Sequence, residues 1–282
     1  MSTFESRRRS RELNEKLIKL ALTSAAAISI LTTFGILFSI LFEAIEFFKL
    51  RSFWYFITGA TWSPGVIGSQ FGALPIFAGT FVITIIALGV AIPVGLGSAI
   101  YMSEYASANI RDYLKPLLEI LAGIPTVVYG FFAAITVAPL VVQIAEFFGL
   151  EATFNSALAS GVVMGIMIIP VISSLSDDVI RAVPDSQRKA AFALGMTHGE
   201  TIKNIVLPSA MPGIISASLL GLSKALGETM IVVMAAGLRP NLSWNPLEDM
   251  TTVTVTIVNS LVGDFEFNSP ETLSAFALGL IL

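Results

Sequence analysis

Long apolar runs alternate with short polar segments along the chain. A helix needs about 20 apolar residues to cross the hydrocarbon core of a bilayer, and five of the runs are of about that length. A sixth run, at 1.5 Å per residue, covers only about half of a ~30 Å core. The pattern predicts about six transmembrane helices, the last one truncated, at residues 20–42, 71–103, 116–142, 157–175, 210–238 and 272–282.

Composition supports a lipid environment. The chain is 55% hydrophobic and 13% charged, and its mean hydropathy is +0.82. Continuous apolar runs favour helices over a β-barrel, whose strands would alternate in hydrophobicity about every second residue. We therefore expect an all-α, polytopic helical membrane protein, with residues 1–282 forming one transmembrane domain.

Basic residues indicate the orientation. With the N-terminal segment 1–19 and the segment 177–208 in the cytoplasm, the cytoplasmic segments hold twelve Lys and Arg residues and the outer segments three. This asymmetry agrees with the positive-inside rule. The segment 239–270 is then an outer loop, and the N-terminus is cytoplasmic.

Several kinds of chemistry are excluded. The sequence has no cysteine and one histidine, His198, so it offers no disulfide, thiol nucleophile or His cluster for a metal. It has no Gly-x-x-x-x-Gly-Lys-Ser/Thr phosphate-binding loop, so it is not an ATPase. We expect no bound cofactor and no nucleic-acid partner, and we assign Glu104, Glu119 and His198 structural or interfacial roles.

The polar segment 177–208 is the most informative part of the sequence. Pro184 can open a short helix, and Ala190, Ala191 and Leu194 then lie on one face. Small residues on that face let another protein approach the backbone closely. Pro208 is expected to end a second short helix and begin the fifth span. The alternative is an amphipathic helix that lies in the membrane interface.

Two charged residues lie in the middle of the fifth predicted span. Lys224 and Glu228 are four residues apart, so they share a face if the helix is continuous. A charge at the bilayer centre costs about 2.5–3.5 kcal/mol, and such residues face a bundle interior or a water-filled path. With their neighbours Ser223 and Thr229 they are predicted to line a translocation path. The alternative is a buried salt bridge that only fixes packing.

The same span carries small residues at four-residue intervals. This stripe permits close helix packing, and we expect it at a subunit or repeat interface. It consists of Gly213, Ala217, Gly221 and Ala225.

The segment 189–208 resembles the cytoplasmic "EAA" loop of ABC importer permeases, which docks on an ATPase. The resemblance rests on Ala190 and Ala191 with the residues that follow at fixed distances, although Lys189 stands where the family usually has glutamate. The residues expected to form this coupling loop are Lys189, Ala190, Ala191, Leu194, Gly195, Ile205, Leu207 and Pro208.

Further motifs resemble the PstC-type permease of phosphate ABC importers. They include Trp62-Ser63-Pro64, Phe71-Gly72-Ala73-Leu74-Pro75, Tyr101-Met102-Ser103-Glu104-Tyr105, Ala122-Gly123-Ile124-Pro125 and Ala225-Leu226-Gly227-Glu228-Thr229-Met230.

This resemblance implies a type I importer (MetI-like) fold in the cell membrane. It also implies a second, PstA-like permease, two PstB-like ATPases that use ATP and Mg, and a PstS-like phosphate-binding protein. Lys224 and Glu228 match positions implicated in passing phosphate, the first of which is more often arginine.

Other functions remain open at this point. A permease for sulfate or molybdate would share these elements, and a basic residue in the membrane does not identify the anion. An ATP-independent secondary transporter would ordinarily show inverted repeats with interrupted helices, which are not visible in the sequence. An intramembrane enzyme would need a catalytic site, and the sequence contains no convincing one. Whether the partner permease is a second copy or a paralogue is also open.

Overall fold

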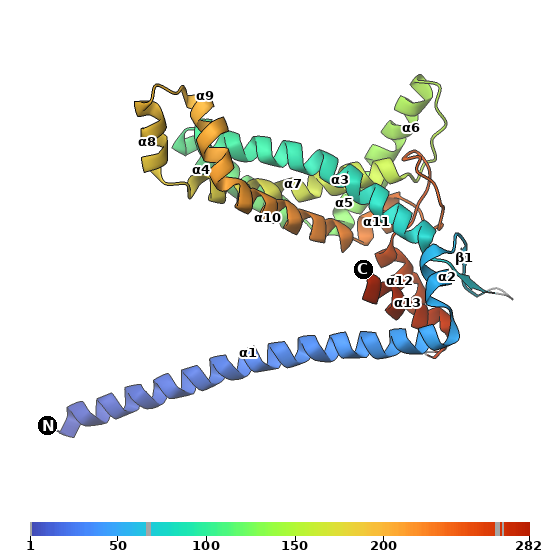
Figure 1. Ribbon diagram of the computed structural model, residues 1–282, viewed down its shortest axis with the longest axis horizontal. Coiled ribbons are helices and arrows are strands. Elements are labelled where there is room, and N and C mark those ends of the chain that lie inside the picture. The colour runs from blue at the N-terminus through green and yellow to red at the C-terminus, as the bar shows by residue number, and fades with distance from the viewer. Residues whose placement is uncertain (1, 66–68, 263–265, 267) are drawn as a thin grey trace.

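In the computed structural model the chain forms helices over most of its length and one short two-stranded ribbon (Figure 1). The structure describes residues 2–65, 69–262, 266 and 268–282, with side chains from residue 14 onward. The side chains of Arg7, Arg8, Arg9 and Arg11, and Asp264 of the predicted outer loop, lie outside this description.

Thirteen α-helices and three π-helical turns are described in these residues. The helices are α1 (Ser2–Leu50), α2 (Phe53–Thr58), α3 (Leu74–Ile100), α4 (Ala108–Ala122), α5 (Thr126–Phe132), α6 (Ala138–Phe147), α7 (Ala157–Arg181), α8 (Asp185–Ala193), α9 (His198–Thr201), α10 (Leu207–Leu226), α11 (Met230–Ala235), α12 (Val253–Val262) and α13 (Pro270–Ile281). The π-helical turns are η1 (Tyr101–Tyr105), η2 (Ala133–Val137) and η3 (Ile202–Val206), and β1 (Trp62–Ser63) pairs antiparallel with β2 (Gln70–Phe71).

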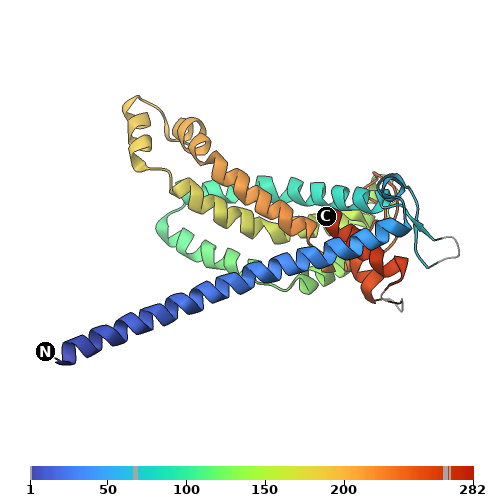
Figure 2. The ribbon, with the colours of Figure 1, turned by 60° about the horizontal axis from the view of Figure 1, so that its bottom comes forward.

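The long apolar helices α3, α7 and α10 run side by side through the centre of the molecule (Figures 1 and 2). α3 and α7 approach closely at Gly165, where a Cβ atom would lie 2.7 Å from the carbonyl oxygen of Ala87. The main buried cluster, which includes Ile83, Met167 and Ile168, lies between these helices. Lipid supplies no hydrophobic force between helices, so this close fit is what holds them together.

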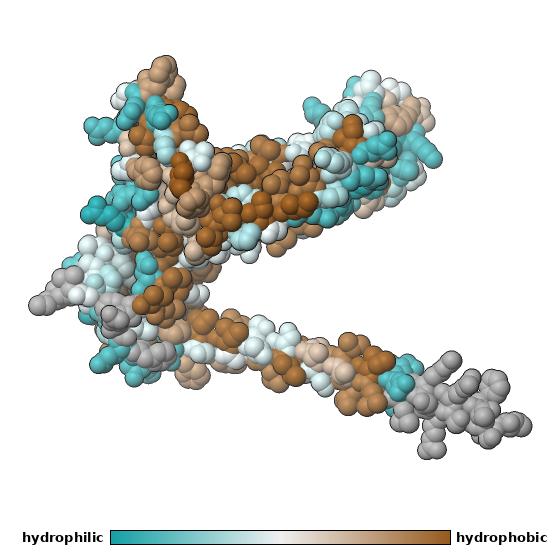
Figure 3. Space-filling view, turned by 180° about the vertical axis from the view of Figure 1, so that it is seen from behind, coloured by the Kyte–Doolittle hydropathy of each residue, from teal (hydrophilic) through white to brown (hydrophobic). Residues whose placement is uncertain are grey.

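α1 is arranged differently. It extends away from the other helices and approaches them only near its C-terminal end (Figure 1). There Ala44 and Phe47 are buried with residues of α2, α3 and α13. Apolar side chains cover much of its remaining length (Figure 3).

Two of the π-helical turns precede prolines. η2 leads into α6, whose second residue is Pro139, and η3 leads into α10, whose second residue is Pro208. A proline ring clashes with the carbonyl group four residues before it, and a π turn widens the helix at that point. The prediction that Pro208 separates two helices is therefore wrong, because one helical segment runs from His198 to Leu226.

The predicted spans differ from the observed ones in two further places. The third predicted span, 116–142, is interrupted at Gly123-Ile124-Pro125; α4 ends before this break, and a span from Thr126 to Phe147 follows it. The fifth predicted span, 210–238, is interrupted between Leu226 and Met230. The residue before a proline avoids helical geometry, which accounts for the first interruption.

Five helical segments in the described residues are long and apolar enough to cross a membrane. They are Asn14–Leu50, Leu74–Tyr105, Thr126–Phe147, Ala157–Arg181 and His198–Leu226. The sixth predicted span is the short helix α13, and the predicted outer loop 239–270 contains a second short apolar helix, α12.

Candidate functional site

The segment between α7 and α10 forms a compact helical hairpin at one end of the molecule (Figure 1). α8 ends in a Schellman motif, in which Met196 N donates to Ala191 O and Gly195 N to Phe192 O. Gly195 has φ +85°, a left-handed conformation that glycine adopts without strain. Thr197 and Glu200 then form a capping box that starts α9.

The predicted coupling residues fall on both faces of this hairpin. Ala191 is buried against the rest of the chain, whereas Lys189 and Ala190 are exposed and Leu194 is 84% exposed. Ile205 and Leu207 are half-buried, and Gly195 and Pro208 are exposed. The exposed side chain of Leu194, which lies beside small residues on a projecting turn, is suited to contact another protein.

Arg188 holds α8 against the neighbouring helices. Its guanidinium donates to Glu104 Oε1 at 2.8 Å and to Ile180 O at 3.0 Å, and it also bonds Val183 O. The Arg188 and Glu104 side chains are 16% and 6% exposed. Glu104 therefore pairs across 84 residues of sequence, a partnership that the local sequence pattern did not reveal.

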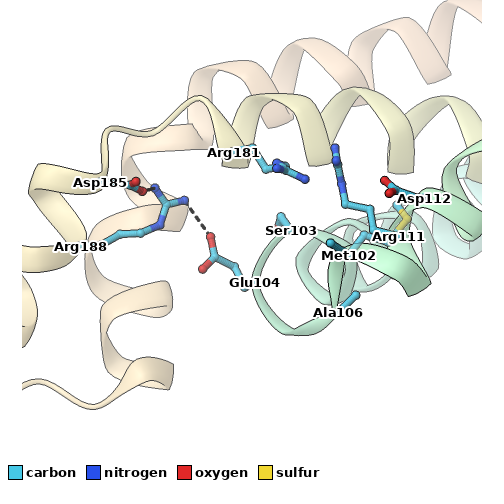
Figure 4. A pocket seen from close by; sticks show the side chains of 10 residues that line it. Met102, Ser103, Glu104, Ala106, Arg111, Asp112, Arg181, Asp185 and Arg188 are labelled. Carbon is cyan, nitrogen blue, oxygen red and sulfur yellow. Dashed lines mark hydrogen bonds and ion pairs between the residues drawn. The ribbon is translucent and has the colours of Figure 1, made fainter.

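A polar cavity of about 480 Å³ lies beside this ion pair (Figure 4). Arg111, Arg181 and Arg188 line it together with Glu104, Asp112 and Asp185, so positive and negative groups are balanced. Arg111 donates a hydrogen bond of 2.7 Å to the carboxylate of the fully buried Asp177. This hydrogen bond is the main reason that the pKa of Arg111 is raised. α4 is thereby fixed to the end of α7.

The predicted pairing of Lys224 with Glu228 on one helix face is wrong. α10 ends at Leu226, and Glu228 lies in the break before α11. The Glu228 carboxylate accepts hydrogen bonds from Met230 N at 2.9 Å and Ile231 N at 3.2 Å, and the residue is 7% exposed. It thus caps the start of α11, where a negative charge is favoured.

Lys224 lies on the last turn of α10 and is half-buried. It forms no ion pair with any residue of the described ranges. Of its predicted companions, Ser223 is exposed and Thr229 is half-buried in the break itself. A lysine without a carboxylate partner next to a break in an apolar helix is available to an anion.

A hydroxyl group from a distant segment contacts the break. The Thr254 hydroxyl donates to the Glu228 carbonyl at 2.7 Å and lies 3.0 Å from the Thr252 hydroxyl. Val253 N donates to the Thr80 hydroxyl of α3 at 3.0 Å. Sequence reasoning missed Thr252, Val253 and Thr254 because it placed 251–254 in an outer loop. The threonines in this segment were the available signal.

The small-residue stripe of α10 packs within the chain. A Cβ atom at Gly213 would lie 2.3 Å from Val179 Cγ1, and one at Gly221 would lie 3.0 Å from Ile172 Cδ1, both on α7. Ala217 and Ala225 are buried as well. The stripe therefore faces α7, not the subunit or repeat interface expected for it.

No group of three or more His, Cys, Asp or Glu residues in the described part of the chain could hold a metal ion. The arrangement instead joins a projecting hairpin at one end of the bundle to a broken helix with a lone basic residue.

Comparisons with known proteins show the family to which the chain belongs. The chain is 33% identical over 279 residues to the probable ABC transporter permease protein YqgH of Bacillus subtilis (strain 168), across 98% of the chain and 89% of the relative. It is 34% identical over 284 residues to the phosphate transport system permease protein PstC of Mesorhizobium japonicum, across 93% and 84%. Another relative, PstC 1 of Mycobacterium tuberculosis, is 33% identical across 78% and 73%.

A solved structure of the MetNI methionine ABC transporter in inward-facing conformations is similar in fold. Its TM-score is 0.52 at 18% identity, over 74% of this chain and 85% of the other. This likeness bears out the expected MetI-like fold. A family model described as "Binding-protein-dependent transport system inner membrane component" matches residues 91–258. Because the family model and these relatives each match more than half of the chain, the chain belongs to this family of ABC transporter permeases.

Proposed function

We propose that this chain is the membrane-spanning permease of an ATP-driven importer that moves inorganic phosphate. The name of the Mesorhizobium japonicum relative supports phosphate as the substrate. The observation that carries the proposal is the break between α10 and α11: Lys224, on the last turn of α10, has no ion-pair partner in the described part of the chain, and the buried Glu228 lies within the break. A buried path for an anion needs such a positive group.

In this proposal the two charged residues have separate tasks. Lys224 offsets the charge of the passing anion as a point charge, since a lysine lacks the bidentate geometry of arginine. Glu228 is already engaged by two backbone N–H groups, so it holds the backbone of the break in place. Ser223 and Thr229 flank the break and supply hydroxyl groups to the path.

The hairpin at the other end is the proposed docking site for the ATPase. Leu194 and the exposed faces of α8 contact an ATPase subunit, which uses ATP and Mg. The basic N-terminus and the segment 177–208 then lie in the cytoplasm, and the loops near α2 and α12 lie outside. A PstA-like permease, two PstB-like ATPases and a PstS-like binding protein complete the importer, and ATP-driven closure switches the path from inward- to outward-facing.

Phosphate uptake by cells or proteoliposomes tests the role of Lys224. Replacing it by glutamine, Lys224→Gln, is expected to lower uptake at least about tenfold, because the anion then enters the bundle without a compensating charge. Lys224→Arg keeps the charge and is expected to retain most uptake. The complexes purified with the wild type, with Lys224→Gln and with Lys224→Arg should contain the same subunits.

Normal uptake by Lys224→Gln would remove the proposed role. Competition with unlabelled anions identifies the substrate. If unlabelled phosphate inhibits the uptake of labelled phosphate and sulfate and molybdate do not, the proposal is supported. Preferential transport of another oxyanion contradicts it. Uptake that persists without ATP would instead favour a secondary transporter.

A further inference from the structure

The ion pair of Arg188 with Glu104 forms a clamp that joins α8 to η1, the π-helical turn that continues α3. Arg188 also binds the carbonyl groups of Ile180, on the last turn of α7, and of Val183, just after that helix. Asp185 adds a longer contact of 3.5 Å to the same guanidinium. The Glu104 side chain is 6% exposed, so this contact lies largely out of solvent. Movement of α8 therefore acts on α3 as well as on α7.

The second arm of the hairpin rests on the same turn. His198, at the start of α9, has its Nε2 atom 3.9 Å from Glu104 Oε2. Its ring stacks on Phe192 of α8 at 6.3 Å and meets Tyr105 edge-on at 5.3 Å. Both arms of the hairpin thus contact residues 104–105, which belong to the π-helical turn η1.

α3 runs from that turn to the region of the helix break. The helical segment is continuous from Leu74 to Tyr105 and packs closely along α7. Near its other end the buried Thr80 accepts a hydrogen bond from Val253 N, and its hydroxyl also donates to Ile76 O at 2.8 Å. One residue later, Thr254 donates to the carbonyl of Glu228.

We propose that α3 is a second mechanical link between the hairpin and the break at Glu228, in addition to the direct link along α10. The link begins at the Glu104–Arg188 clamp and ends at the hydrogen bonds of Thr80 and Thr254, so Glu104 and Thr80 are positioning residues. This inference rests on the proposed function, because the displacement that it transmits serves transport. Packed side chains, hydrogen bonds and rigid helices are the groups that carry such coupling.

The experiment measures phosphate transported per ATP hydrolysed by the purified importer in proteoliposomes. Glu104→Gln and Thr80→Val are made singly and together; the first removes the charge that binds Arg188, the second removes the hydroxyl that accepts from Val253 N, and both preserve side-chain size. We expect each to lower the ratio about fivefold, a typical size for coupling between sites. Because both act on one link, the double variant is also expected to lose about fivefold, whereas independent effects would multiply to about 25-fold.

Two controls separate this role from a general loss of structure. Asp112→Asn changes another carboxylate of the same cavity, which forms no ion pair in the described part of the chain, and should keep the normal ratio. Thr80→Ser keeps the hydroxyl and should restore the ratio lost in Thr80→Val. If Glu104→Gln does not assemble, Thr80→Val with its serine rescue decides the matter. An unchanged ratio in the single variants, or multiplicative losses in the double, would overturn the proposal.

A second measurement does not depend on the transported substance. The chain contains no cysteine, so Ser107→Cys and Ser186→Cys introduce two unique label sites on exposed residues beside η1 and on α8. Electron-spin distance measurements should give one narrow distribution with and without nucleotide, and a broad one when Glu104→Gln is added. A narrow distribution in that variant contradicts the clamp. A wild-type importer that does not transport phosphate contradicts the proposed function and leaves this test of the clamp intact.

Discussion

α1 and the pair α3–α7 are similar in apolar character and differ in what surrounds them. In the most apolar stretch of each helix, 0% of α1 residues are buried, against 56% for α3 and 61% for α7. A Cβ atom at Gly35 of α1 would meet nothing within 4 Å, whereas one at Gly165 of α7 would collide with α3. Hydropathy therefore brings a helix into the membrane, and the fit of small residues decides which helices pack together.

The C-terminal end of α1, where this helix packs against the others, should show the largest effect on stability. Phe47 is fully buried and meets Phe56 and Phe71 edge-on at 5.2 and 5.6 Å, whereas Phe38 is 57% exposed. Phe47→Ala is expected to lower the free energy of unfolding by about 3 kcal/mol or more through the cavity that it leaves. Phe38→Ala should change the same quantity, measured by denaturant titration in detergent, by less than about 0.5 kcal/mol. Equal losses at both positions would show that α1 is packed along its length.

A smaller effect is expected from filling the contact between α3 and α7. Gly165→Leu places atoms 2.7 Å from the Ala87 carbonyl oxygen and 2.8 Å from Val90 Cβ, and this overpacking should cost about 1–3 kcal/mol. Gly35→Leu is the matched control on α1 and should be neutral or slightly stabilising, because leucine is the better helix former. Thermal unfolding of both variants checks the comparison, which fails if Gly165→Leu unfolds at the wild-type temperature.

The smallest expected effect concerns the loop that covers the start of α7. Ala157 N and Leu158 N donate to the carbonyl groups of Glu248 and Pro246. Hydrogen bonds from Ser243, then Asn245 and Asn241, lower the pKa of the Glu248 carboxyl group. The ionised Glu248 carboxylate therefore makes its full contribution to stability above its pKa in the unfolded chain, about 4.3. This contribution is lost as the pH falls through the lower pKa of the folded state.

Hydrogen exchange at Ala157 and Leu158 measures this loss. Exchange should accelerate below about pH 4 in the wild type, after correction for the intrinsic rate. Glu248→Gln should show little of this dependence because it has no carboxylate to protonate. The same acceleration in the variant would assign the effect to another group.

The helical membrane class and the permease fold could be predicted from the sequence. The membrane class depends on the length and hydropathy of the apolar runs, and the fold was predicted through the resemblance to known permeases, which rests on local motifs such as the spacing from Ala190 to Pro208. The helix breaks were harder to predict. An apolar run looks the same whether its backbone is continuous or interrupted, so Lys224 and Glu228 were placed on one helix face that does not exist.

Only the tertiary structure showed which distant residues meet. The sequence indicates a structural or interfacial role for Glu104, and the structure shows its partner, Arg188, 84 residues away on the hairpin between α7 and α10. The neighbouring residues Val253 and Thr254 bind two distant parts of the chain, the Thr80 hydroxyl and the Glu228 carbonyl group. The length and hydropathy of the apolar runs determine that these helices enter a membrane, because lipid favours side chains that are apolar on average over a whole span. Packing at glycines and hydrogen bonds between separate segments determine the site, because such contacts depend on shape in three dimensions and leave little trace in a local pattern.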